Sequence, residues 1–129
     1  MNHFFRTRTK AIGYAIEGWY HVIRTQKNAW IHALFSVGVI LMAIWLRLPR
    51  HDWVIIILTI TMVWMAEFIN TALETLTDLV SPDSNNLAKI SKDVGAAAVL
   101  ITAGASIIIG TLILGPPLWQ KIQMMIPGS

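Results

Sequence analysis

The sequence predicts an all-α membrane protein, with an N-terminal amphipathic surface helix followed by three transmembrane helices. Hydrophobic residues make up 55% of the 129 positions and charged residues only 13%, whereas an ordinary soluble domain carries about 25% charged residues. Three long apolar stretches are separated by short polar segments. A chain of this length forms a single domain, here residues 1–129. The sequence contains no cysteine, which excludes disulfides and thiolate metal sites.

The surface helix is predicted over residues 10–28. Apolar side chains, including Trp19, share one face of a helix in this stretch, and most charged side chains lie elsewhere. A basic amphipathic helix with tryptophan on its apolar face typically lies in the plane of the membrane surface. The alternative is a soluble helix packed on a partner, but the apolar stretches that follow favour the membrane surface. Residues 1–10 lack the apolar core and cleavage site of a signal peptide, so we expect no cleaved signal.

Three spans are predicted over residues 30–46, 53–79 and 94–114, each close to the length of about 20 residues that crosses a bilayer. Pro49 separates the first two spans because proline cannot continue a helix. The turn-forming sequence SPDSNN separates the second span from a short polar helix that leads into the third.

The third span is rich in small residues, which permit close approach of neighbouring helices. These small residues are Gly95, Ala96, Ala97, Ala98, Gly104 and Gly110. The sequence Gly115-Pro116-Pro117 is expected to end the span, because proline removes a helical hydrogen bond and clashes with the preceding turn.

Lysine and arginine are unevenly distributed between the two predicted sides of the membrane. One side carries Arg6, Arg8, Lys10, Arg24, Lys27, Lys89 and Lys92. The other carries Arg47, Arg50 and Lys121. The richer side is expected to be cytoplasmic, which places the N-terminus and the end of the second span in contact with the cytoplasm.

Four polar residues follow one another at helical spacing in the second span: Glu67, Asn70, Glu74 and Asp78. Spacings of three and four residues place them on one face of the helix. Glu67 lies about 21 Å along the helix from Trp53, still within the ~30 Å hydrocarbon layer. A carboxylate there costs at least ~2.5 kcal/mol unless it faces protein, water or a cation. A frayed polar helix end would account for Asp78 but not for Glu67, so the stripe indicates a functional acidic site.

These groups and the nearby lysines suit phosphoryl transfer. Mg²⁺ is usually held by one or two carboxylates together with substrate phosphates, and lysine binds phosphate as a point charge. We assign the deeper Glu67 as general base and Glu74 as metal ligand. No P-loop or kinase Gly-rich loop occurs. A rival interpretation, ion or proton translocation, also uses intramembrane carboxylates, but the clustering of acids with lysines at one interface favours a kinase.

The sequence EFINTALETLTDLV (67–80), followed by KISKDVGAAAVL (89–100), resembles the bacterial diacylglycerol kinase and undecaprenol kinase family of small membrane lipid kinases. Residues 10–33 are similar to the same family. The resemblance implies a homotrimer in the bacterial inner (cytoplasmic) membrane, with active sites shared between subunits. It also implies Mg²⁺ as cofactor, ATP as phosphate donor and a lipid substrate, with no role for nucleic acid.

The resemblance implies specific roles for residues that match the family's motif. It makes Glu67 the catalytic base, Asn70 its polar neighbour and Glu74 a metal ligand. Nucleotide-binding positions of the family correspond to Lys10, Tyr14, Gly18, Glu74, Asp78, Lys89, Lys92 and Asp93.

One position departs from the family pattern. A second metal-binding glutamate commonly precedes the first span, and here that position is Gln26. An amide oxygen can still coordinate Mg²⁺ but adds no charge, so Gln26 is a weak ligand candidate and an inactive relative of the kinase stays an alternative. Both diacylglycerol and undecaprenol present a primary hydroxyl. The combination of Asn28, Ile31 and His32 looks more like the undecaprenol kinase branch. The four histidines show no ligand spacing and are interpreted as interface or hydrogen-bonding residues.

Overall fold

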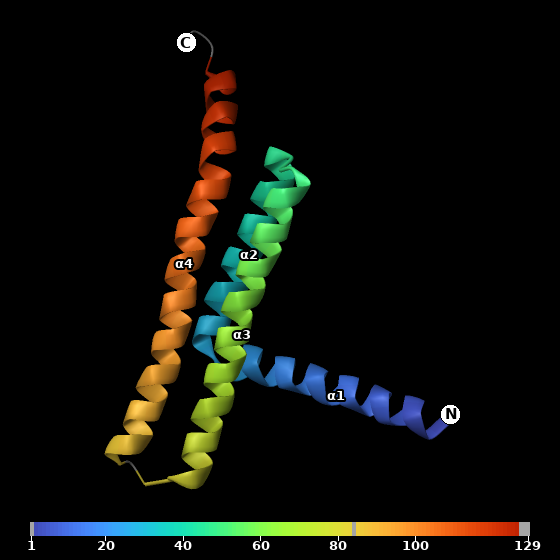
Figure 1. Cartoon of the computed structure of the whole chain (residues 1–129), viewed down its shortest axis with the longest axis vertical. Helices are drawn as coiled ribbons and strands as arrows, with labels where there is room; N and C mark the ends of the chain where they lie inside the picture. The colour runs from blue at the N-terminus through green and yellow to red at the C-terminus, as the bar shows by residue number, and fades with distance from the viewer. Residues whose placement is uncertain (1, 84, 127–129) are drawn as a thin grey trace.

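Four α-helices form the computed structural model, which describes residues 2–83 and 85–126, with side chains described from Lys10 onward. The helices are α1 (Asn2–Thr25), α2 (Lys27–Leu46), α3 (Arg50–Val80) and α4 (Asn86–Met125). α2, α3 and α4 run side by side, and α1 leaves them at a steep angle (Figure 1). The chain therefore divides into a three-helix bundle and one projecting helix.

The three helices of the bundle are the predicted spans, since each is long and apolar enough to cross a membrane. α2 and α3 each begin about one turn before the predicted start. α4 is much longer than predicted, because its 40 residues rise about 60 Å, twice the thickness of the hydrocarbon layer. It joins the expected short polar helix and the third span into one continuous element.

The prediction that Gly115, Pro116 and Pro117 end the third span is wrong. α4 continues through both prolines to Met125. A proline removes only its own N–H bond, and membrane helices tolerate this loss where the freed groups find other partners. The extension is also tied to the bundle, because Lys121 Nζ donates a 2.7 Å hydrogen bond to the Trp45 carbonyl at the end of α2. The ammonium group lies 4.4 Å from the centre of the Trp45 ring.

The break between α1 and α2 falls at Gln26, which has an extended backbone (φ −97°, ψ 113°). The predicted surface helix therefore exists as a helix, ending at Thr25 rather than at residue 28. Trp19 packs α1 against the bundle. The centre of the Trp19 ring lies 4.8 Å from that of Trp64 and 4.7 Å from that of Phe68, both on α3. Trp64 is thus a packing residue.

Burial differs between the two ends of the bundle. Near the α2–α3 turn the buried cluster is apolar and consists of Ala43, Leu48, Ile56 and Leu114. Towards the other end the buried side chains on α3 include Glu67, Asn70 and Thr71. Most large apolar side chains are exposed, as suits a protein surrounded by lipid or by other membrane helices.

The small residues of α4 were predicted to permit close approach of a neighbouring helix, and only some of them do so within this chain. Gly95 packs so closely on α3 that an added Cβ would collide with Asn70 Oδ1. Gly104 and Gly110 have no atom within 4 Å of such a Cβ, so for these two the prediction of close approach is wrong within this chain.

Candidate active site

Glu67 is the largest fully buried side chain in the described part of the molecule, with 1% of its surface exposed. The polar group that faces it is His32 on α2, whose Nε2 lies 3.6 Å from Glu67 Oε2. Both atoms are buried and neither has a hydrogen-bond partner. A buried carboxylate oxygen without a partner is costly, and such groups are typical of functional sites.

Glu74 lies two turns further along α3 and is held differently. Its Oε2 accepts a 3.2 Å hydrogen bond from Gln26 Nε2, and its Oε1 accepts a 2.9 Å hydrogen bond from Asn70 Nδ2. Gln26 occupies the break between α1 and α2, 48 residues away in sequence. The structure therefore brings together the two residues that the sequence analysis named as metal ligands.

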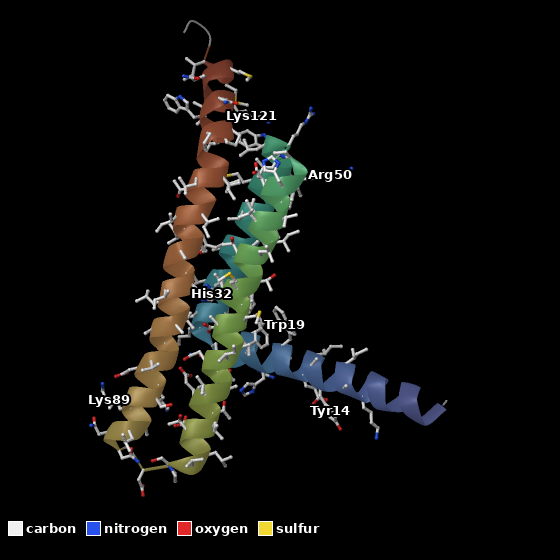
Figure 2. All side chains as sticks on the ribbon, in the orientation of Figure 1. Tyr14, Trp19, His32, Arg50, Lys89 and Lys121 are labelled. Atoms are coloured by element: carbon white, nitrogen blue, oxygen red, sulfur yellow. The ribbon has the colours of Figure 1, made fainter. Side chains whose placement is uncertain are left out.

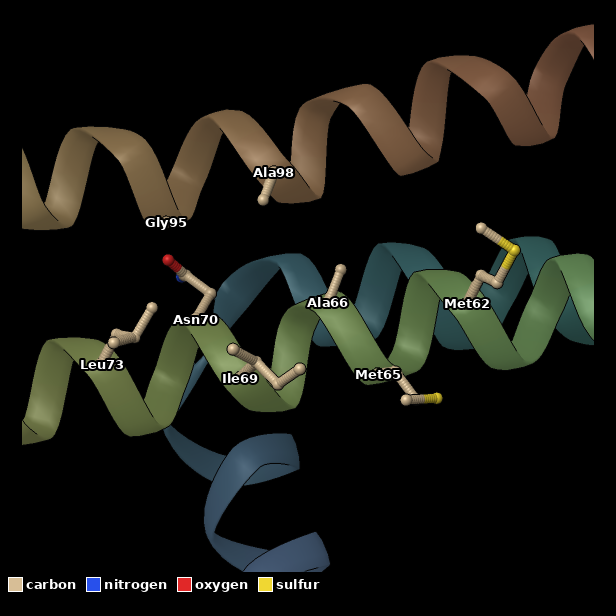
Figure 3. Close-up of a pocket in the computed structure, with 8 residues that line it drawn as sticks. All are labelled: Met62, Met65, Ala66, Ile69, Asn70, Leu73, Gly95 and Ala98. Atoms are coloured by element: carbon tan, nitrogen blue, oxygen red, sulfur yellow. The ribbon is translucent and has the colours of Figure 1, made fainter.

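Asn70 connects Glu74 to α4. Its side chain points towards Gly95 (Figure 3), and its Oδ1 is buried without a hydrogen-bond partner. The two residues lie beside an apolar cavity of about 300 Å³ between α3 and α4. A larger apolar cavity of about 490 Å³ lies between α2, α3 and α4, and His32 forms part of its wall.

The predicted nucleotide-binding residues of the α3–α4 hairpin form two ion pairs. Lys92 Nζ lies 2.5 Å from Asp78 Oδ1 and joins the two helices. Lys89 Nζ lies 2.6 Å from Asp93 Oδ2 on the exposed surface of α4. The hydrogen bond to Asp93 raises the pKa of Lys89, which keeps the amine charged. This end of the hairpin therefore presents charges of both signs, of which Asp78 lies about one turn along α3 from Glu74.

Of the three predicted nucleotide-binding residues of α1, Tyr14 lies away from the charged end of the hairpin (Figure 2). Lys10, Tyr14 and Gly18 are exposed. Figure 2 shows Tyr14 far out on α1 and Lys89 at the far end of the α3–α4 hairpin. Tyr14 precedes the break at Gln26 by a helical rise of about 18 Å, so its ring does not reach the ion pairs of the hairpin.

His32 is the residue that sequence reasoning missed. Its sequence neighbours resemble a family branch, but a histidine without ligand spacing gives no sign that it faces Glu67. The pairing depends on how α2 packs on α3. A signal was available in the helical position of His32 on the first span, where a polar side chain in an apolar stretch requires a partner.

The donor set at Glu74 fits Mg²⁺ in chemical type. Within residues 2–83 and 85–126 no group of three histidine, cysteine or acidic side chains is placed to hold a metal. Glu74 supplies a carboxylate, and rotation of the Gln26 and Asn70 amides would turn two further hard oxygens towards it. Mg²⁺ sites often contain only one or two carboxylates, with phosphates and water completing the shell.

Comparison with known proteins gives a consistent result. Residues 13–114 match the family described as prokaryotic diacylglycerol kinase. The chain is 42% identical to a diacylglycerol kinase of Synechocystis sp. over 106 residues, which cover 81% of this chain but 61% of that protein. It is 36% identical to an undecaprenol kinase of Bacillus subtilis over 118 residues, covering 92% and 93% of the two chains.

A diacylglycerol kinase of Escherichia coli (strain K12) is 30% identical over 112 residues, which cover 81% of this chain and 86% of that protein. The lipid kinase family predicted from the sequence is therefore confirmed, and with it the predicted class of enzyme. The three apolar helices and the prokaryotic family together indicate a bacterial membrane protein. With the match covering most of its length, the chain belongs to the prokaryotic diacylglycerol kinase family of membrane lipid kinases.

Proposed function

We propose that this lipid kinase transfers the γ-phosphoryl group of ATP to the primary hydroxyl of undecaprenol or diacylglycerol at the cytoplasmic membrane interface. The observation that carries the proposal is a buried carboxylate, Glu67, two turns of α3 from a second carboxylate held by amides, Glu74. The first suits proton removal and the second suits cation binding. The membrane supplies the hydroxyl and the cytoplasm supplies the nucleotide.

Glu67 acts as the general base. The lipid hydroxyl oxygen attacks the γ-phosphorus, the bond between that phosphorus and the bridging β-oxygen breaks, and ADP leaves. The hydroxyl proton passes to Glu67. Positioned acid–base groups typically contribute 10²–10⁴-fold in rate. The burial of Glu67, which is 1% exposed, keeps water away from the base.

Glu74 would hold Mg²⁺, with the amide oxygens of Gln26 and Asn70 as uncharged ligands after rotation of the two amides. When bound, the ion neutralises charge on the β- and γ-phosphates, which is its usual contribution in phosphoryl transfer. Because Gln26 replaces a carboxylate of the family pattern, Glu74 is the single charged protein ligand. The proximity of Gln26 Nε2 to Glu74 Oε2, 3.2 Å, supports a shared role for the two side chains.

The charged end of the α3–α4 hairpin binds the nucleotide. Lys92 and Lys89 offset phosphate charge, and Asp78 and Asp93 hold the two amines in place through their ion pairs. In phosphoryl transfer most of the catalytic effect comes from such positioning and charge stabilisation. The apolar cavities next to Asn70 and His32 suit a hydrocarbon chain rather than a polar acceptor.

The active enzyme is a homotrimer with shared sites. Tyr14 lies far out on α1, away from Lys89 at the end of the α3–α4 hairpin of its own chain (Figure 2). A neighbouring copy in the membrane would supply Lys10, Tyr14 and Gly18. Exposed apolar side chains on all three bundle helices are consistent with such contacts. α1 lies on the cytoplasmic membrane surface, where its basic residues face anionic lipid headgroups.

A phosphate-transfer assay in mixed micelles tests the proposal. The purified protein receives Mg-ATP with diacylglycerol in one tube and undecaprenol in another, and Glu67→Gln serves as the control. Transfer to one lipid that is lost in the variant supports both the reaction and the base. Absence of transfer to either lipid across a range of Mg²⁺ concentrations would overturn the proposal and favour an inactive relative.

A further inference from the structure

The environment of His32 indicates a role beyond packing. Its side chain is 13% exposed, yet Nε2 itself is buried and has no hydrogen-bond partner. Glu67 Oε2 faces it, with 3.6 Å between the two atoms. This oxygen is also buried without a hydrogen-bond partner. Two buried polar atoms that face one another without other partners satisfy each other most simply, because water cannot reach either of them.

We propose that His32 is a positioning residue for Glu67, donating its Nε2–H to Glu67 Oε2 and thereby turning Oε1 towards the acceptor hydroxyl. This inference rests on the proposed kinase function and deepens it. His32 holds Oε2 of Glu67 in place, and Oε1 is left to receive the proton. A base oriented by a third group is a general arrangement in enzymes that activate hydroxyl nucleophiles.

The surroundings of the pair support anchoring rather than ligand binding. Neither Nε2 of His32 nor Oε2 of Glu67 is accessible from the cavities, so an incoming hydroxyl does not reach them. The Trp64 ring lies 6.5 Å from the His32 ring in an edge-on arrangement, and its Nε1 donates a 3.2 Å hydrogen bond to Ser36 Oγ on α2. Trp64 thus fixes α2 against α3 one turn from His32 and limits movement of the imidazole.

A second histidine–carboxylate pair in the same chain provides contrast. His51 Nε2 lies 3.1 Å from Asp52 Oδ1, but the His51 side chain is 77% exposed. This pair lies at the start of α3, at the opposite end of the bundle from the candidate site. An exposed pair of this kind contributes little, so the same substitution at His51 controls for the general effect of removing an imidazole.

The experiment compares three variants with the wild-type protein in the mixed-micelle assay: His32→Met, His32→Gln and His51→Met. Methionine removes the N–H donor with little loss of volume, whereas glutamine retains a donor close to the position of Nε2. We expect His32→Met to lower kcat about 100-fold, the usual effect of a misplaced catalytic group. The KM for ATP should be unchanged, His32→Gln should recover most of kcat, and His51→Met should resemble wild type.

If His32 had only a structural role, kcat would not depend on a hydrogen-bond donor at this position. The inference is overturned if His32→Met keeps kcat within threefold of wild type, or if glutamine recovers no more activity than methionine. It is also overturned if the loss appears in the KM for ATP. In the Glu67→Gln background, His32→Met should cause no further loss of kcat, because an anchor has no function without the base.

A measurement that needs no turnover separates this inference from the proposed function. In protein labelled with 15N-histidine, Glu67→Gln should move the imidazole signals of His32 and leave those of His51 in place. Unchanged His32 signals would overturn the pairing. If the wild-type protein transfers no phosphate while the His32 signals respond to Glu67→Gln, the proposed function fails and the pairing stands.

Discussion

Glu67 and Glu74 lie on the same helix, two turns apart, in very different surroundings. Glu67 is 1% exposed and its Oε2 faces only His32. Glu74 is partly buried, and both of its oxygens accept hydrogen bonds from the amides of Gln26 and Asn70. The two residues are the same amino acid on the same face of α3, so tertiary contacts alone distinguish them.

The difference shows how one helix prepares a carboxylate for each of two tasks. A carboxylate with an unpaired oxygen in apolar surroundings is suited to accept a proton. A carboxylate held at both oxygens by uncharged donors is fixed in place, as suits a cation ligand. The trend continues to Asp78, which is exposed and ion-paired with Lys92. Burial thus decreases along α3 in the direction of the α3–α4 turn.

Replacing the base should have the largest effect. For Glu67→Gln we expect kcat to fall by about 10³-fold or more, because the amide accepts no proton, while the KM for ATP and the Mg²⁺ dependence stay unchanged. Steady-state kinetics in mixed micelles measure all three. The variant should assemble normally, since glutamine has nearly the same shape as glutamate. Near-normal turnover would contradict the assignment.

Glu74→Gln should be less severe and different in kind. The variant loses the single charged ligand, so we expect about a 100-fold loss of kcat/KM at ordinary Mg²⁺ concentrations, equivalent to about 2.7 kcal/mol. High Mg²⁺ should restore part of the activity. A titration of Mg²⁺ against rate distinguishes the two glutamates. If high Mg²⁺ restored Glu67→Gln instead, the two roles would have to be exchanged.

Gly95→Ala tests whether Asn70 holds Glu74. The new Cβ would meet Asn70 Oδ1 and displace the amide that donates to Glu74 Oε1. We expect roughly a tenfold loss of activity, because small displacements of catalytic groups are costly. The rate of the variant should also depend less on the Mg²⁺ concentration than the rate of the wild-type protein does. Gly104→Ala is the matched control, because it lies on the same helix with no atom within 4 Å. If the two substitutions had equal effects, the prediction that Asn70 holds Glu74 in place would be wrong.

Gln26→Glu should produce the smallest change, and one in the favourable direction. A second carboxylate opposite Glu74 Oε2, at the present 3.2 Å separation, repels its neighbour without a cation and attracts Mg²⁺. We expect the apparent Mg²⁺ affinity to rise about tenfold, or about 1.4 kcal/mol, and thermal stability without Mg²⁺ to fall. An unchanged Mg²⁺ affinity would show that Gln26 does not contact the ion.

The sequence by itself determined the class of fold and much of the site. Apolar stretches of spanning length are confirmed as helices because a backbone in lipid must satisfy its own hydrogen bonds. The stripe of Glu67, Asn70 and Glu74 was visible because helical spacing alone places these residues on one face. Motif similarity added the family, which the comparisons confirm. These inferences depend on local geometry and on short-range patterns.

Only the tertiary structure determined the contacts between residues that are far apart in the sequence. The continuation of α4 beyond Pro116 depends on the contact of Lys121 with Trp45, which lies 76 residues away in sequence. The hydrogen bond of Gln26 to Glu74 and the position of His32 opposite Glu67 depend on how α1, α2 and α3 meet. The burial of a side chain is set by the helices that surround it, so two glutamates of one helix acquire different surroundings only when the chain is folded.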